Sequence, residues 1–160
     1  MDHETARNAA MFAYAGLFGI TGALIEEVGL EKSIEIRSEV FRKIGTAQGK
    51  MLKEQAGIEG EVDAQTAHQL IEPLVQTIGI VTEPIEAGPD QVVMRVGPCP
   101  VYNAAAAVGW DPEMMKIGCE AGAMNFMDAV VKQLNPNLSM RLAEFREEPG
   151  SCCLEEIVIE

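Results

Sequence analysis

The first half of the chain repeats apolar residues at the three- and four-residue spacing of amphipathic helices. This pattern predicts helices over residues 5–28, 31–55 and 63–78. Asp63 is expected to cap the third helix, and Pro73 to kink or break it. The second helix carries charges of both signs, which is typical of a solvated face. These charges are Glu35, Arg37, Glu39, Arg42 and Lys43.

In the second half the pattern changes to two short alternating segments, then helices, then two more alternating segments. The strands are expected at 79–85, 91–96, 138–146 and 152–159, and the helices at 101–108 and 111–133. The order predicts an α+β fold, in which the N-terminal helices pack on an antiparallel sheet made of two β-hairpins. We expect one domain, 1–160, with a mainly helical half (1–78) and a half that carries the cysteines (79–160).

The first helix contains an uncharged run, 9–25, that approaches the length of a membrane span. Glycines interrupt the run and two glutamates end it, so we expect a buried helix of a soluble protein and no membrane segment. Small residues at helical spacing also allow close approach of another helix, either within the core or in a homodimer. These are Ala15, Gly19 and Gly22.

The chain has 160 residues and a formal net charge of −13. This charge repels a phosphate backbone, so nucleic acid is not an expected partner, and anionic membrane surfaces are disfavoured. The acidic start, Met1-Asp2-His3-Glu4, lacks the basic region of a secretory signal. We therefore expect a cytoplasmic protein whose four cysteines are reduced, and are free, catalytic or metal-bound.

The cysteines are the main candidates for chemistry. Cys99 directly precedes a predicted helix, where the helix dipole favours a thiolate, and Glu120 beside Cys119 could act as an acid. A free cysteine can also be no more than a small buried hydrophobic residue. Alternatively, Cys99, Cys119 and Cys153 could form a three-cysteine zinc site, although no C-x₂-C pair is present.

Two arginines follow in the predicted strand at 138–146. Because the positions of Arg141 and Arg146 differ by an odd number, the two side chains are expected on opposite faces. One of them could hold a carboxylate of a ligand. The other reading is cross-strand pairing with Glu155 or Glu156.

Several short motifs follow one another from about residue 92: Cys99-Pro100-x-Tyr102, Cys119-Glu120, Asn135-Pro136, a basic strand, and Gly150-x-Cys152-Cys153 before an alternating terminal strand. In this order they resemble the L-2-amino-thiazoline-4-carboxylic acid hydrolase family. A more distant likeness is to the 4-vinyl reductase domain, a small-molecule-binding α+β module.

The family resemblance implies hydrolytic opening of a cyclic isothiourea carboxylic acid. In that hypothesis Cys99, Cys119 and Glu120 are catalytic, while Tyr102, Asn135 and Arg141 bind the substrate. The alternative hypothesis is a non-catalytic module in which the thiols bind zinc or line an apolar pocket for a small molecule. Methionines concentrated in the helix at 111–133 suit such a pocket, and they also suit an ordinary core.

Overall fold

The computed structural model describes residues 2–160 and confirms the predicted α+β fold. The helices are α1 (His3–Val28), α2 (Leu30–Gln55), α3 (Ala64–Gln76), α4 (Pro100–Ala107), α5 (Pro112–Cys119) and α6 (Asn125–Leu134). A π-helical turn, η1 (Glu120–Met124), joins α5 to α6. The strands are β1 (Thr82–Ala87), β2 (Gln91–Val96), β3 (Leu138–Glu144) and β4 (Cys153–Ile159).

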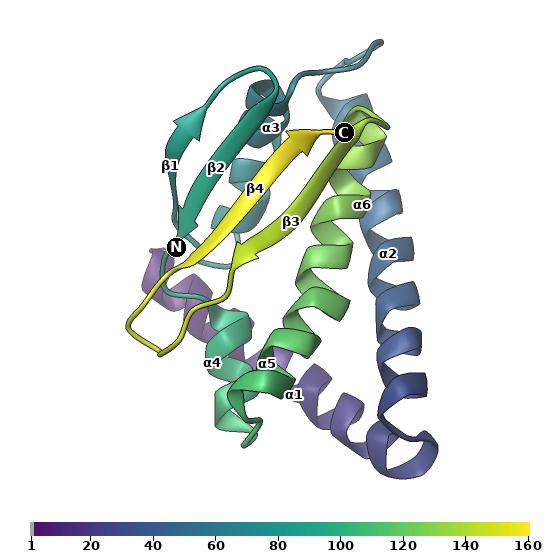
Figure 1. The fold of residues 1–160 in the computed structure, drawn as a ribbon, viewed down its shortest axis with the longest axis vertical. Helices are drawn as coiled ribbons and strands as arrows, with labels where there is room; N and C mark the ends of the chain where they lie inside the picture. The colour runs from purple at the N-terminus through teal and green to yellow at the C-terminus, as the bar shows by residue number, and fades with distance from the viewer. Residues whose placement is uncertain (1) are drawn as a thin grey trace.

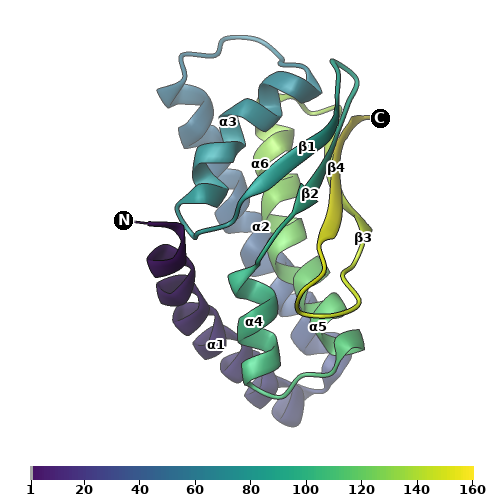
Figure 2. The same cartoon turned by 90° about the vertical axis from the view of Figure 1, so that its left-hand side faces the viewer.

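The four strands form one antiparallel sheet in the order β1-β2-β4-β3 (Figure 1). Each hairpin contributes an inner strand, and β2 pairs with β4 along its whole length, from Gln91 opposite Val158 to Val96 opposite Cys153. Helices α2, α3 and α6 lie on the same side of the sheet (Figure 2). Side chains of alternate residues therefore point toward the helices.

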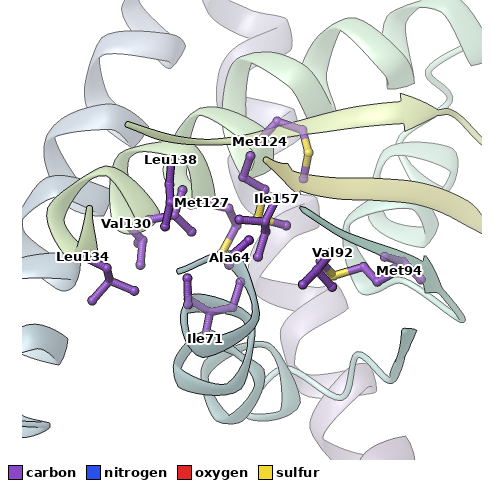
Figure 3. Close-up of a cluster of buried hydrophobic side chains, with 14 of the residues drawn as sticks. Ala64, Ile71, Val92, Met94, Met124, Met127, Val130, Leu134, Leu138 and Ile157 are labelled. Atoms are coloured by element: carbon purple, nitrogen blue, oxygen red, sulfur yellow. The ribbon is translucent and has the colours of Figure 1, made fainter. Parts of the chain in front are cut away.

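The main hydrophobic core lies between this inner face of the sheet and helices α3 and α6 (Figure 3). Ile71 of α3, Leu134 of α6 and Ile157 of β4 are almost completely buried in it. Helix α2 forms a further layer behind α6, and the two helices approach closely at Gly45 and Gly49. A methyl group at either glycine would meet backbone carbonyl oxygens of α6.

The prediction that α1 is a buried helix is wrong for this chain. Only Ala6, Phe18 and Thr21 of α1 are buried, whereas Phe12 is 83% exposed and Ile20 is 61% exposed. The helix is long and apolar enough to cross a membrane by length and composition, and just 11% of its most apolar window is buried. It contacts α2 and α4, along one side only.

Arg37 corrects a second expectation, because its side chain is not on the solvated face of α2. The guanidinium is buried between the rings of Phe18 and Phe41, 4.7 and 4.8 Å from their centroids. It donates hydrogen bonds to the carbonyl oxygen of Gly118 (3.1 Å) and to Oγ1 of Thr21 (3.1 Å), and burial lowers its pKa. Arg37 thus connects α1, α2 and α5.

Two helix boundaries also differ from the prediction. Pro73 does not break α3, which continues to Gln76 and ends within one turn of the proline. The helix expected at 111–133 is interrupted by the π-helical turn at Glu120–Met124. The extra residue in that turn rotates α6 relative to α5. Both segments can therefore bury their apolar sides, although they would not lie on one face of a regular helix.

Candidate functional site

A cavity of about 410 Å³ lies between the helices and the inner face of the sheet. Its wall is predominantly apolar and comes from α1, α2, α3, the sheet and the segment from α5 to α6. Ala13, Leu17, Phe41, Ile44, Ile71, Val75, Met94, Val101, Met127 and Met140 are among the lining residues. Leu17, Ile44 and Thr77 are exposed, which places the mouth between α1, α2 and the end of α3.

The local sequence explains why this space is apolar. Met94 and Val96 point toward the cavity from β2, where they alternate with outward-facing residues. Met127 of α6 also lines the cavity. Ala10 and Ala13 of α1 line the same space and have too little volume to fill it. The volume is in the usual range for pockets that bind small molecules.

Polar side chains interrupt the apolar wall, among them Glu155 of β4, His68 of α3 and Thr82 of β1. Nε2 of His68 and Oγ1 of Thr82 are buried and have no hydrogen-bond partner among residues 2–160. Burial raises the pKa of Glu155 to about 7, while the positive charge of Arg146 acts in the opposite direction. A carboxyl with this pKa is divided between its neutral and charged forms near neutral pH.

Cys99 and Cys119, from the residue before α4 and the last residue of α5, also line the cavity. A small hollow next to it brings these two thiols together with Cys153, Tyr102 and Arg146. Folding thus gathers three of the four cysteines at one place. Cys152 lines neither space.

The state of these thiols does not favour nucleophilic chemistry. Burial raises the pKa of Cys99 to about 11, and it raises the pKa of Cys119 well above its ordinary value. Cys99 caps α4, yet the loss of hydration outweighs the stabilisation of a thiolate by the N–H groups of Val101 and Tyr102. Both thiols are therefore protonated at neutral pH.

Arg146, and not Arg141, lies beside the cysteines. Its Nε donates to Sγ of Cys153 (3.3 Å), and its Nη2 donates to the carbonyl oxygens of Val96 (3.3 Å) and Gly97 (2.8 Å). The guanidinium carbon lies 5.1 Å from the ring centroid of Tyr102. The strand that was expected to reach residue 146 ends at Glu144, so Arg146 is in the loop and can turn inward.

Arg141 and Glu120 line a separate shallow groove, and none of the cysteines lines it. Nε of Arg141 pairs with Oε1 of Glu156 at 2.6 Å on the outer face of the sheet, which confirms the cross-strand alternative. Glu120 is exposed and does not line the cavity. The structure therefore does not bring together the predicted acid, the predicted carboxylate clamp and the thiols.

Asn135 has a structural partner for each end of its amide. Its Nδ2 donates to the carbonyl oxygen of Val62 (2.9 Å), and its Oδ1 accepts from the backbone N–H of Asn137 (2.9 Å). These bonds connect the end of α6 to the loop before α3. The side chain is buried there and does not line the cavity.

The zinc alternative lacks a ligand set. Within residues 2–160, no group of three or more His, Cys, Asp or Glu side chains is arranged to hold a metal ion. The predicted set of Cys99, Cys119 and Cys153 shares its hollow with the guanidinium of Arg146. A fixed positive charge in hydrogen-bond contact with Cys153 opposes a cation at that position.

The sequence analysis missed His68, and it assigned Glu155 to a surface ion pair. The available signal was the alternation of the last strand, in which Glu155 shares its face with Cys153 and Ile157. An acidic residue flanked on its own face by two buried residues is unusual in an ordinary core. No comparable local pattern distinguishes His68.

No protein-family model matches the sequence, and no curated protein matches it. Two solved structures share the fold. The phenol-responsive sensory domain of the transcription activator PoxR, solved with phenol, has a TM-score of 0.63 at 11% identity, over 91% of this chain and 74% of that one.

The second solved structure is a trafficking protein particle complex subunit 3 from Naegleria fowleri, covalently bound to palmitic acid. It has a TM-score of 0.59 at 8% identity, over 93% of this chain and 96% of that one. Neither neighbour is a thiazoline hydrolase, so that family resemblance stays a prediction. What the two likenesses establish is the fold, which this chain shares with domains that hold small molecules.

Proposed function

We propose that this protein is a binding module for a small, predominantly apolar molecule, held in the cavity between the helices and the sheet. The observation that carries the proposal is the cavity itself, about 410 Å³ with a mainly apolar wall and a mouth beside α1 and α2. An empty space of this size forfeits dispersion contacts and costs stability, and a ligand restores them. The two fold neighbours support the proposal, since phenol and palmitic acid are both apolar molecules with one polar end.

The test is binding of 4-butylphenol to the purified full chain, measured by calorimetry and by the shift in thermal midpoint. A matched pair of variants locates the site. Ala123 lines the cavity, and Ala123→Phe should fill part of it and weaken binding at least tenfold. Ala107 is exposed at the end of α4, and Ala107→Phe should leave binding unchanged. Equal binding by both variants would place the ligand elsewhere.

The hydrolase hypothesis is the second candidate, and the presence of Cys99 and Cys119 in the cavity wall is the observation in its favour. It requires a thiolate at Cys99 and an acid near it, and the candidate acid Glu120 lies outside the cavity. Turnover of 2-amino-thiazoline-4-carboxylate by the native chain, abolished in Cys99→Ser with the fold intact, would establish it. Absence of turnover in the native chain would remove it.

We also propose that the exposed apolar face of α1 is covered by a second copy of the chain. Phe12, Gly16, Gly19 and Ile20 lie at helical spacing on this face, and a methyl group on either glycine would meet nothing within 4 Å. Small residues next to large apolar ones permit close helix approach. Gly19→Leu should therefore yield monomers in sedimentation experiments. Gly60→Leu, in an open loop, is the control and should remain a dimer. Equal masses for both variants would contradict the dimer.

A further inference from the structure

Glu155 has an unusual place for an acidic side chain. It lies on the inner face of β4, between Cys153 and Ile157, and is paired in register with Met94 of β2 and Leu142 of β3. It lines both the large cavity and the small hollow that contains the thiols. Within residues 2–160 its carboxylate forms none of the ion pairs and none of the hydrogen bonds of the structure.

Glu155 shares the large cavity with Tyr14, His68 and Glu72. In the small hollow its charged and titratable neighbours are Arg146 from the loop after β3, Cys99 from the residue before α4, Tyr102 from α4, Cys119 from α5 and Cys153 from β4 itself. The thiols Cys99 and Cys119 are held neutral by burial. Arg146 is the only full charge of this group, and it uses its Nε and Nη2 for Cys153 and two backbone carbonyls. Its remaining nitrogen, Nη1, is buried without a partner in the same hollow, and no hydrogen bond or ion pair joins it to Glu155.

An ionised acceptor that faces an apolar cavity without a protein partner is costly unless a ligand or water supplies a donor. Elsewhere in the structure, carboxylates at least partly protected from solvent do have partners. Asp128 accepts from Ser139 Oγ and from the backbone N–H of Met140, and Glu156 accepts from Gln91 and Arg141. The contrast with Glu155 indicates that its partner is a molecule from outside the chain.

We propose that Glu155 is the polar anchor of the cavity, and that it selects apolar ligands whose polar end is a neutral hydroxyl donor, of the phenol or alcohol type. This inference rests on the proposed binding function and narrows its ligand class. The hydroxyl donates to the carboxylate of Glu155, while the apolar body occupies the space lined by Met94, Met127 and Ile71. No proton is transferred and no covalent bond is formed.

The same geometry disfavours two other ligand classes. A carboxylate-ended ligand of equal size would bring a second negative charge beside Glu155, in a site of low dielectric constant. A pure hydrocarbon would fill the cavity but would leave the acceptor unpaired and cut off from water. Glu155 therefore decides which polar end is accepted, and the apolar wall decides the size of the body.

Three compounds with a common body test the proposal at pH 8: 4-butylphenol, butylbenzene and 4-butylbenzoate. A hydrogen bond to a charged group predicts that the phenol binds at least tenfold more tightly than the hydrocarbon, and that the benzoate binds most weakly. Glu155→Leu should bind phenol and hydrocarbon equally. Glu156→Leu is the matched control, because Glu156 is the next residue on β4 but pairs with Arg141 on the outer face and lines neither space, and it should keep the full preference.

The outcomes separate this inference from the proposed function. If none of the three compounds binds the native chain, the binding function itself is wrong. If they bind with equal affinity, or if Glu155→Leu keeps the preference for the phenol, the cavity binds ligands but Glu155 is not the anchor. Tighter binding of the benzoate than of the phenol would likewise overturn the ligand class. Circular dichroism of each variant verifies that the fold is retained.

Discussion

Replacing Gly45 with alanine should destabilise the protein, although alanine is the better helix former. Gly45 is buried in the middle of α2, where an added methyl carbon would collide with the carbonyl oxygen of Phe126 and lie 3.0 Å from Cβ of Ala129. The collision is with backbone, which cannot rotate away as a side chain can. Overpacking of this kind costs about 1–3 kcal/mol. We expect a cost near 3 kcal/mol, because the backbone of α6 is rigid. The higher helix propensity of alanine offsets about 1 kcal/mol of this cost, so we expect the free energy of unfolding to fall by about 2 kcal/mol.

The same substitution at Gly60 provides the control, because Gly60 is exposed in the loop before α3 and a methyl group there meets nothing within 4 Å. Gly60→Ala should increase the free energy of unfolding by up to about 1 kcal/mol. Urea denaturation of both variants at equal protein concentration, with unchanged slope, measures the two effects. The reasoning fails if Gly45→Ala is as stable as the native chain, because α2 and α6 would then not be in backbone contact.

Two further predictions follow from the cavity. The pKa of Glu155 is raised to about 7 in the folded chain, above the value of 4.5 expected in the unfolded chain. The folded state therefore holds the proton more tightly. The free energy of unfolding should fall by up to about 3 kcal/mol as the pH rises from about 4.5 to 7. Glu155→Gln should remove this dependence of the free energy of unfolding on pH, and Glu72→Gln should not. If the free energy of unfolding of the native chain and of Glu155→Gln changed with pH in the same way, the burial of the carboxyl would be contradicted. Because burial raises the pKa of Cys99 and Cys119, iodoacetamide at pH 7 should modify these thiols far more slowly in the folded chain than in urea. Mass spectrometry of peptides measures the extent of modification. Rapid modification of Cys99 in the folded chain would refute its assignment as a buried, protonated thiol.

Much of the local structure could be predicted because its causes are local. Asp63 and Asp111 cap α3 and α5 as their sequence positions suggest, and their side chains accept hydrogen bonds from the backbone N–H groups three residues later. The turn between 87 and 91 and the alternation on either side of it define the first hairpin. Such signals involve residues within a few positions of one another, so they are present in the sequence whatever the rest of the chain does.

The burial of single residues was predicted less well, because it depends on partners far along the chain. Arg37 looks like one of many charges on α2, and only the approach of Phe18 and Gly118 from other helices buries it. Glu155 looks like one of two adjacent surface acids, and only the layer of helices over the inner face turns its position into a cavity wall. In both cases the local pattern is compatible with a solvated residue.

The sequence alone determined the α+β class, the order of helices and hairpins, and the acidic character of the chain. Only the tertiary structure decided that β2 and β4 are the inner strands, that α1 stays largely exposed, and that Cys99, Cys119 and Glu155 meet at one cavity while Glu120 and Arg141 do not. The physical reason is the range of the interactions. Caps, turns and periodicity act between near neighbours, whereas burial, strand order and the shape of an empty space are set by contacts between residues that only folding brings together.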